Sequence, residues 1–232
     1  MSERFFLQTE PCDQRAELAG DEARHLSRVL RARVGDVVRV FDGRGCEWPA
    51  RVAAIGRDTV ALDLGPVMPG VARDGPPLTL AVALPKGDRQ KWLVEKLTEL
   101  GVARLVPLIA ERGVAEATPA ARDRLRRSSI EACKQCGRNV LLDITAPATI
   151  AEVADPGAAG VVVVIASPDA ARLDADGLRR GSSAIVAIVG PEGGFTDAEV
   201  ARAVAAGALP VGLGPHVLRV ETAAVALAAR LL

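Results

Sequence analysis

Long apolar runs are missing from this sequence of 232 residues. No stretch approaches the roughly 18 consecutive apolar residues of a membrane-spanning helix. The first residues, Met-Ser-Glu-Arg-Phe-Phe, are charged and lack the basic-then-apolar order of a signal peptide. Hydrophobic residues make up 49% of the chain, which suffices for a core. We therefore expect a globular, cytoplasmic protein with no membrane partner.

Cysteine is also scarce. The four cysteines, Cys12, Cys46, Cys133 and Cys136, are too few and too scattered to cross-link a chain of this size, so we expect free thiols. The spacing of Cys133 and Cys136 suits half of a zinc site, but a structural site needs a second ligand pair, and neither histidine lies at ligand spacing. We therefore expect no metal site and interpret Cys133 and Cys136 as two small apolar side chains on a helix.

Aromatic residues amount to 3%, with no tyrosine, four phenylalanines and two tryptophans. Most of them lie in apolar patterns, where packing in a core is the expected role. The chain therefore has few aromatic rings on which a nucleobase could stack, and recognition of any RNA partner would have to rely on other residues.

An excess of charge of one sign is absent too, because the formal net charge is zero. An acidic partner would have to be met by local clusters rather than by a global field. Two basic clusters exist, and most of their members are arginines, which suit bidentate phosphate contacts. They are Arg24, His25, Arg28, Arg31 and Arg33, and Arg122, Arg124, Arg126, Arg127, Lys134 and Arg138. Each cluster alone could equally be a solvated helix surface.

The first part of the chain predicts short β-strands and one helix. Turn residues separate alternating segments at 37–41, 48–55 and 59–64, and this close turn spacing favours a small β-barrel. The helix is predicted over 18–30. We expect Asp21 to cap it and one apolar face to carry Ala23, Leu26, Val29 and Leu30.

The segment 65–77 is rich in proline and glycine and separates a region of short predicted strands from one in which longer apolar strands alternate with helices. We place the domain boundary there, with one domain at 1–70 and a second at 71–232. Beyond it, nearly continuous apolar strands alternate with helices, which predicts an α/β domain with a mostly parallel sheet. The strands are expected at 78–84, 103–109, 139–144, 161–166, 184–189 and 208–213.

Three helices of the second domain have recognisable ends. One over 88–100 should stop at Gly101 and bury Trp92, Leu93, Leu97 and Leu100. Another should begin at Thr118-Pro119 and end at Gly137. The third should begin with a capping box formed by Thr196 and Glu199.

Ligands of open α/β sheets bind beyond the carboxyl ends of strands, so we expect a site in the loops after Ile165, Val189 and Leu213. Gly190 to Gly194 and Gly212 to Gly214 would let backbone approach a ligand closely, although tight turns are the alternative for either loop alone. Neither matches a common nucleotide signature. Glu192 disfavours a polyanion and suits hydroxyl, amino or sulfonium groups.

These two loops carry a specific resemblance. The segments 188–199 and 213–223 resemble the signature pair of the SPOUT methyltransferases, and more closely the RsmE type, which methylates N3 of a uridine in 16S ribosomal RNA. The segments 96–102 and 131–138, with Pro107 and Glu111-Arg112, are similar to that family's connecting motifs, and 25–31 and 41–45 to its PUA-like RNA-binding barrel. The resemblance covers nearly the whole chain.

The resemblance implies an N-terminal PUA-like barrel, a C-terminal SPOUT α/β domain with a deep trefoil knot, and a homodimer. It also implies S-adenosylmethionine as the cofactor, held largely by backbone groups of three loops. Carried onto this chain, the cofactor-binding positions are Ile165, Ala166, Gly190, Pro191, Glu192, Gly193, Gly194, Leu213, Gly214, Val217, Leu218 and Thr222.

Arg219 and Glu221 are the expected catalytic residues. A permanently charged guanidinium can stabilise negative charge that develops on a uridine carbonyl, although it cannot be the base. Glu221 could accept the proton, orient Arg219, or simply stabilise the start of the last helix. His216 departs from the arginine that is common in the family and is interpreted first as a structural or phosphate contact, with a role as base as the alternative.

The expected RNA contacts are His25, Arg28, Arg31, Arg138 and His216. The expected partner is 16S ribosomal RNA or the small ribosomal subunit. Two other functions stay open: methylation of another RNA position, and a non-catalytic dimeric RNA-binding protein. The residues do not distinguish naked RNA from the assembled particle as the substrate.

Overall fold

The computed structural model describes residues 3–70, 75–155 and 157–232. Their contacts divide the chain into two compact units. One holds the described residues of Met1–Ala72 together with Ile130–Leu141, and the other those of Arg73–Ser129 and Leu142–Leu232. The predicted boundary between 70 and 71 adjoins residues 71–74, which lie outside the described residues. The grouping of Ile130–Leu141 with the first unit is a feature that the sequence did not suggest.

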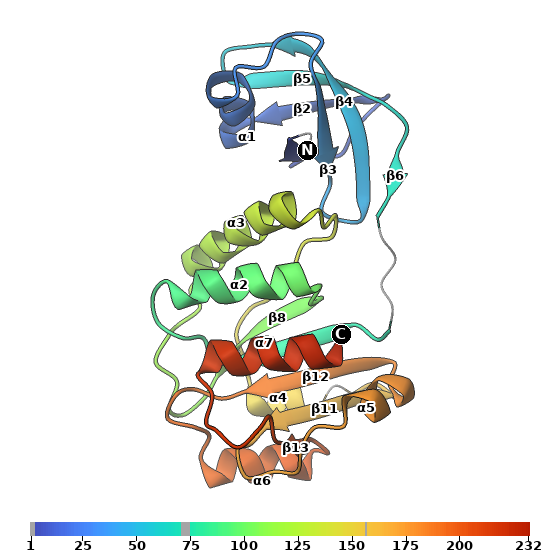
Figure 1. The fold of residues 1–232 in the computed structure, drawn as a ribbon. Helices are drawn as coiled ribbons and strands as arrows, with labels where there is room; N and C mark the ends of the chain where they lie inside the picture. The colour runs from blue at the N-terminus through green and yellow to red at the C-terminus, as the bar shows by residue number, and fades with distance from the viewer. Residues whose placement is uncertain (1–2, 71–74, 156) are drawn as a thin grey trace. The chain divides into compact units, whose positions relative to one another are not determined.

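The first unit is built on a six-stranded sheet in the order β1-β3-β4-β5-β2, with β6 paired to β4 (Figure 1). Its strands are β1 (Arg4–Phe6), β2 (Arg15–Ala19), β3 (Val37–Phe41), β4 (Cys46–Ile55), β5 (Thr59–Leu64) and β6 (Met68–Pro69). Along β3, Val38 and Val40 are buried while Val37 and Arg39 are exposed, which is the alternation expected of a strand with one face on a core. The predicted strands 37–41 and 59–64 are confirmed, and the one at 48–55 begins two residues earlier.

The predicted helix over 18–30 is wrong in its start and its apolar face. Residue 18 still belongs to β2, and α1 (Gly20–Arg24) passes directly into the π-helix η1 (His25–Val29). Asp21 does not cap the helix but pairs with Arg24. The wider π-helical turn, in which the Leu30 amide donates to the His25 carbonyl at 3.0 Å, rotates Val29 off the buried face and leaves it 69% exposed.

Arg4 explains why Ile130–Leu141 belongs to the first unit. Its guanidinium donates to Glu47 at 2.8 Å, to the carbonyl oxygen of Cys133 at 2.5 Å and to the side chain of Asn139. The same guanidinium lies 4.7 Å from the centre of the Phe41 ring. Because these partners come from β3, β4 and residues 133–139, one buried cation connects all three segments.

The second unit contains a parallel sheet in the order β10-β8-β7-β12-β11-β13, with β9 paired to β8. Its strands are β7 (Leu78–Val82), β8 (Arg104–Ile109), β9 (Asp143–Ile144), β10 (Ala148–Thr149), β11 (Val161–Ala166), β12 (Ala184–Val189) and β13 (Leu209–Val211). The α/β class and the strands at 161–166 and 184–189 are confirmed. The expected strand at 139–144 shrinks to β9, because Leu141 donates its amide to Gly43 of the first unit rather than to this sheet.

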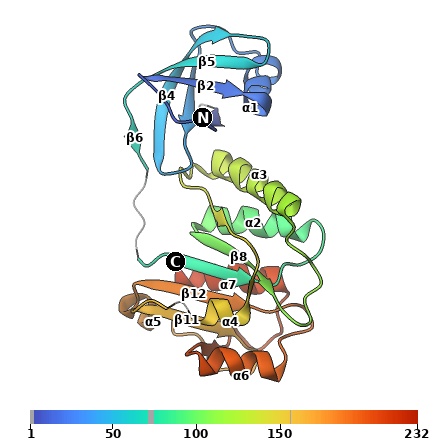
Figure 2. The ribbon, with the colours of Figure 1, turned by 180° about the vertical axis from the view of Figure 1, so that it is seen from behind.

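Helices cover both faces of this sheet (Figures 1 and 2). One buried cluster joins the sheet to α2 (Arg89–Leu100), α5 (Ala175–Gly181) and α7 (Val220–Leu231), and another joins it to α4 (Ile150–Ala154) and α6 (Asp197–Ala205). Strands with near-continuous apolar sequence are explained by this burial on both sides. Of the side chains expected to be buried on α2, Leu93 and Leu97 are, whereas Trp92 is 43% and Leu100 37% exposed.

The predicted helix ends are confirmed where glycine or a capping box defines them. The helix α2 ends at Gly101, which has a φ of 90°, and α3 (Pro119–Cys136) is followed by Gly137 with a φ of 83°. Thr196 and Glu199 form the expected capping box at the start of α6. Among the described residues, no helix combines the length and apolarity needed to cross a membrane.

Candidate functional site

Four neighbouring parallel strands, β7, β12, β11 and β13, end at the same edge of the second unit's sheet. The loops that leave this edge begin at residues 83, 190, 167 and 212. Three of them were expected from the sequence to form a site, and the fourth, which leads from β7 into α2, was not. Ligands of parallel α/β sheets are bound at such an edge.

The loop 190–194 is held in place by its own turn and by the loop after β8. The amide of Gly194, whose φ is 69°, donates to the carbonyl oxygen of Pro191 at 2.9 Å. Arg112 donates from Nη1 to the carbonyl oxygen of Gly193, also at 2.9 Å. A side chain at Gly190 would meet the ring of Phe195 at 3.0 Å, so this turn packs tightly against the residue that follows it. The loop is therefore shaped before any ligand arrives.

Glu199 connects the start of α6 to the loop after β8. Its carboxylate accepts from the amide of Thr196 at 2.8 Å, and also from the amide of Glu111 at 2.9 Å. The side chain is buried, and burial alone would raise the pKa of Glu199, but the bonds from the Thr196 and Glu111 amides outweigh it and hold that pKa below its ordinary value.

A pH-dependent contribution to stability follows from this lowered pKa. Ionised Glu199 stabilises the fold above the pKa it has in the unfolded chain, and that stabilisation is lost as the pH falls through the folded-state pKa. We expect Glu199→Gln to lower the free energy of unfolding by about 1.5–3 kcal/mol near neutral pH, the range for hydrogen bonds to charged groups. The difference from the unaltered protein should shrink as the pH is lowered below the ordinary glutamate value of 4.5.

Urea denaturation at several pH values measures this effect. Glu152 offers a matched control, because it forms the same capping box with Thr149 at the start of α4 but is exposed. Near neutral pH, Glu152→Gln should cost clearly less than Glu199→Gln. Equal costs for the two variants, or a gap for Glu199→Gln that does not depend on pH, would contradict the interpretation.

The loop after β13 crosses the loop after β11 at very short range. The amide of Gly212 donates to the carbonyl oxygen of Ala171 at 2.7 Å, and the amide of Leu173 donates to the carbonyl oxygen of Gly212 at 3.1 Å. A Cβ atom at Gly212 would collide with the carbonyl oxygen of Ala170. Glycine is therefore required here by the close approach of two backbones, and the interpretation of this glycine as a mere turn residue does not account for it.

The two expected catalytic residues lie at the start of α7 but in different environments. Arg219 is the N-cap residue and is exposed, and its guanidinium makes no hydrogen bond or ion pair within the described part of the chain. Glu221, in the first turn, is only 7% exposed. Its Oε2 has no hydrogen-bond partner among the described residues, and the nearest cation is Nη1 of Arg89 at 3.6 Å. Of the three roles left open for Glu221, orientation of Arg219 has no ion pair to support it, and the cation beside Glu221 is Arg89.

Arg89 is the residue that the sequence analysis missed. It is the first residue of α2, and its Nη2 also lies 3.0 Å from Oε1 of Glu192. We call Arg89, Glu192 and Glu221 the Arg89 cluster, which connects the loop 190–194 to the start of α7. A signal was available, since the sequence Lys86-Gly87-Asp88-Arg89 follows a buried strand in the way that the loops already singled out do.

The other expected cofactor positions differ in accessibility. Ile165 and Pro191 are buried, so only their backbone or a small part of the side chain could face a ligand. Ala166, Leu213 and Leu218 are half-buried, whereas Gly193, Gly214, Val217 and Thr222 are exposed. Val217 is the most open of the described large hydrophobic residues, at 82%.

The expected RNA contacts fall into two sets, one in each unit. In the first unit, His25 is half-buried, and its ring lies 6.0 Å from that of Phe5. Arg28 forms an ion pair with Asp58 at 3.6 Å. Arg31 is exposed and has a φ of 54°. Arg138 belongs to the same unit and is half-buried. His216 lies exposed in the loop after β13 of the second unit.

The cysteines are free, as expected, but the two that are closest in sequence differ. Cys133 is buried beside Phe6 and Phe41, and Cys136 is exposed. The interpretation of both as small apolar residues therefore holds for Cys133 alone. Within the described residues there is no group of three His, Cys, Asp or Glu side chains that could hold a metal ion.

Comparison with known proteins adds family information to this geometry. Residues 73–232 match the family model of an RNA methyltransferase domain, and residues 18–64 match that of an RNA methyltransferase PUA domain. The ribosomal RNA small subunit methyltransferase E of Synechocystis sp. is 35% identical over 209 residues, which cover 86% of this chain and 66% of that protein. This chain thus spans just under two thirds of that relative's length.

Two solved structures are similar over nearly the whole chain. The ribosomal RNA small subunit methyltransferase E of Neisseria gonorrhoeae, bound to S-adenosyl methionine, has a TM-score of 0.88 at 32% identity and covers 99% of this chain and 96% of its own. A methyltransferase structure from Legionella pneumophila, in complex with the cofactor SAM, has a TM-score of 0.89 at 30% identity, with coverage of 100% and 97%.

Proposed function

Because the chain belongs to the RNA methyltransferase family that includes ribosomal RNA small subunit methyltransferase E, we propose that it methylates N3 of a uridine in 16S ribosomal RNA, with S-adenosylmethionine as the methyl donor. The observation that carries the proposal is the edge of the second sheet. There, the glycine loops 190–194 and 212–214 leave the parallel strands β12 and β13, which flank β11, beside the exposed Arg219 and the buried Glu221.

The residues at this edge fit a cationic cofactor. The Arg89 cluster contains two carboxylates and one guanidinium, so it retains a net negative charge, and one buried carboxylate oxygen in it lacks a hydrogen bond. A ligand with a sulfonium and an amino group would complement that charge. The backbone of residues 190–194 and 213–218, with Ile165, Ala166 and Thr222, would hold the rest of the molecule. S-adenosylmethionine would supply an electrophilic methyl group there.

Arg219 and Glu221 would divide the chemistry on the uridine. The N3–H bond must break with its electron pair left on the ring, which places negative charge on N3 and the two flanking carbonyl oxygens. Glu221 would accept the proton on its unsatisfied Oε2. Arg219, whose donors are unengaged within the described chain, would donate to a carbonyl oxygen as charge develops. His216, exposed in the same loop, is assigned to an RNA phosphate.

Arg89 would act as a positioning residue for both carboxylates. We expect Arg89→Ala to lower kcat by about 10-fold, because it removes the cation beside the buried Glu221, while solvent screens the pair through Arg89, whose side chain is 39% exposed. The KM for the cofactor should rise only a few-fold. Arg89→Lys, which keeps the charge but not the fork, should recover part of kcat.

Steady-state kinetics with both substrates varied measure that division between kcat and KM. Arg104→Ala is the matched control, since Arg104 pairs with Asp143 at 2.8 Å at the opposite, amino end of the strands. That variant should behave like the unaltered protein. If Arg89→Ala changed only thermal stability, or if the lysine variant recovered nothing, the positioning role would be ruled out.

The proposal includes a homodimer, a trefoil knot around the loop after β13, and a cytoplasmic location. The close crossing of Gly212 over residues 170–173 supports the knot, because it places the last segment of the chain directly against an earlier loop. Exposed apolar side chains on the second unit, among them Val217 and Ile109, support the burial of part of this surface by a second copy. Sedimentation of the purified protein tests the dimer.

The function is tested by incubating the protein with labelled S-adenosylmethionine and small ribosomal subunits from cells that lack this methylation. One uridine should become labelled, and mass spectrometry of nuclease fragments should locate the methyl group on N3. Naked 16S RNA in parallel shows whether the assembled particle is required. No transfer to either substrate, or transfer to a ribose oxygen, would reject the proposal.

Calorimetry distinguishes an enzyme from a non-catalytic RNA-binding protein. Titration with S-adenosylmethionine should give saturable heat, and the unsatisfied oxygen of Glu221 favours that outcome, since a merely structural domain would gain nothing from leaving it unpaired. Absence of binding together with intact RNA affinity would favour the structural role.

A further inference from the structure

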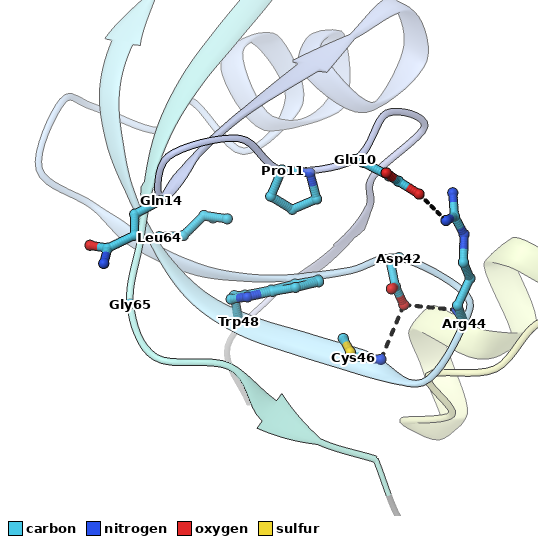
Figure 3. A pocket seen from close by; sticks show the side chains of 9 residues that line it. All are labelled: Glu10, Pro11, Gln14, Asp42, Arg44, Cys46, Trp48, Leu64 and Gly65. Atoms are coloured by element: carbon cyan, nitrogen blue, oxygen red, sulfur yellow. Dashed lines mark hydrogen bonds and ion pairs between the residues drawn. The ribbon is translucent and has the colours of Figure 1, made fainter.

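A cavity of about 390 Å³ opens on the first unit, and none of the residues that line it has been assigned a catalytic, cofactor-binding or RNA-binding role above (Figure 3). Its walls come from the loop before β2, the turn between β3 and β4, strand β4 and the end of β5. The lining side chains used below are Glu10, Pro11, Asp42, Arg44, Trp48 and Leu64. The volume falls in the range of pockets that hold small organic ligands.

Two rings form the apolar part of this cavity. Figure 3 shows the indole of Trp48 lying flat below the ring of Pro11, with Leu64 at one end. Trp48 is half-buried and packs against the buried core of the sheet. Most aromatic residues lie in apolar patterns and were expected to pack in the core, and Trp48 does so on one side only. The other side faces the cavity.

The opposite end of the cavity is polar and well ordered. Asp42 accepts through Oδ1 from the amides of Arg44 at 2.8 Å and Cys46 at 3.1 Å, so its carboxylate is fixed at the rim. Glu10 pairs with the exposed Arg44 at the same end. Carboxylates accept hydrogen bonds, so this end suits a ligand edge that carries N–H donors.

The required ligand is therefore flat, with apolar faces and N–H donors on one edge. We propose that this cavity binds one unpaired nucleobase of the RNA substrate, stacked on Trp48 with an amino group toward Asp42. Adenine, cytosine and guanine carry such an exocyclic amino group, whereas uracil offers only the single N3–H that the methyl transfer removes, so we assign the cavity to a neighbour of the target uridine. The inference rests on the proposed function only in taking RNA as the ligand.

This site would add base recognition to a surface that otherwise contacts the RNA backbone. Arginines of the first unit, such as Arg28 and Arg31, would hold phosphates, which positions RNA without reading its sequence. Stacking of a base on an aromatic ring contributes enough to change affinity by roughly 5- to 150-fold. One tryptophan can therefore matter in a chain with few aromatic residues.

The chain offers a clean optical test, because it has two tryptophans and no tyrosine. In a Trp92→Phe background, the tryptophan fluorescence comes from Trp48 alone. Titration with single-stranded tetranucleotides of adenosine or cytidine should quench it saturably, whereas a uridine tetranucleotide should bind more weakly. A duplex of the same base composition should have little effect, since its bases are not free to enter the cavity.

Binding of labelled tetranucleotides to variants completes the test. Trp48→Leu should weaken binding of the adenosine tetranucleotide by roughly 5-fold or more, whereas Trp48→Phe, which keeps a ring, should stay within about 3-fold of the unaltered protein. Equal thermal melting of the two variants excludes unfolding as the cause. Calorimetric affinity for S-adenosylmethionine should be unchanged in both, so a failure of this site is distinct from a failure of the methyltransferase proposal.

Three results would overturn the inference. They are equal RNA affinities for the leucine and phenylalanine variants, no quenching of Trp48 by any tetranucleotide, and adenosine monophosphate binding as tightly as the tetranucleotide. The last would make the cavity a site for free nucleotides rather than for RNA.

Discussion

Arg219→Ala should lower the rate of methyl transfer by about 100-fold or more, the usual effect of removing a donor that stabilises developing charge. Affinity for S-adenosylmethionine should stay nearly unchanged, because the exposed guanidinium makes no hydrogen bond or ion pair with the described loops that would hold the cofactor. The helix should also keep its start, since Arg219 makes no side-chain capping bond. Single-turnover kinetics and calorimetry measure the two quantities separately.

Two further variants sharpen this expectation. Arg219→Lys keeps the positive charge but loses the fork, so its rate should lie between those of the alanine variant and the unaltered protein. Arg230→Ala removes an arginine from the last turn of the same helix and should leave the rate alone. Parallel losses of affinity and rate in Arg219→Ala would mean that Arg219 binds cofactor rather than stabilising charge on the uridine.

Gly212→Ala is the second change for which we expect a large effect. The added methyl group would strike the carbonyl oxygen of Ala170, so one of the two crossing loops must move. Such a shift would break the bonds of Gly212 to Ala171 and Leu173, which together should lower the free energy of unfolding by about 1–3 kcal/mol. Both loops border the proposed cofactor site, so cofactor affinity should fall by about 10-fold or more, as a loss of 1.4 kcal/mol in binding energy would produce.

Gly181→Ala provides the comparison for that variant. A Cβ atom at Gly181 would have nothing within 4 Å, and its φ is not in the left-handed region, so the substitution should leave stability and binding almost unaltered. Chemical denaturation and calorimetric titration report both properties. If Gly212→Ala matched Gly181→Ala in both, the crossing of the two loops would not be needed for the site.

Much of the second unit was predictable because its signals are local. The apolar runs at 161–166 and 184–189 are long enough to require burial on both faces, and the structure has strands there with the predicted limits. Gly101, Gly137 and the Thr196 capping box end or begin helices through interactions within a few residues. Such features depend on backbone conformation and neighbouring side chains, which the sequence displays directly.

Two predictions failed where the backbone departs from the regular structure that the local sequence suggests. The helix after β2 widens into a π-helical turn, and the expected apolar face breaks at Val29 as a result. Regular 3.6-residue spacing was assumed, and nothing in the local sequence signals the extra residue in that turn. The segment 139–141 has the apolar character of a strand, yet its backbone bonds to residues 43–45 of the first unit.

By itself, the sequence determined the strand-loop-helix order, the two glycine loops and the presence of Arg219 and Glu221 beside them, because each depends on residues close together in the chain. Only the tertiary structure decided which cation meets Glu221, and it is Arg89 at 3.6 Å rather than Arg219. The order of strands in the sheet places β7 next to β12, and this brings the start of α2 to the loop 190–194. Pairings of that kind follow from the packing of whole elements, which local spacing does not specify.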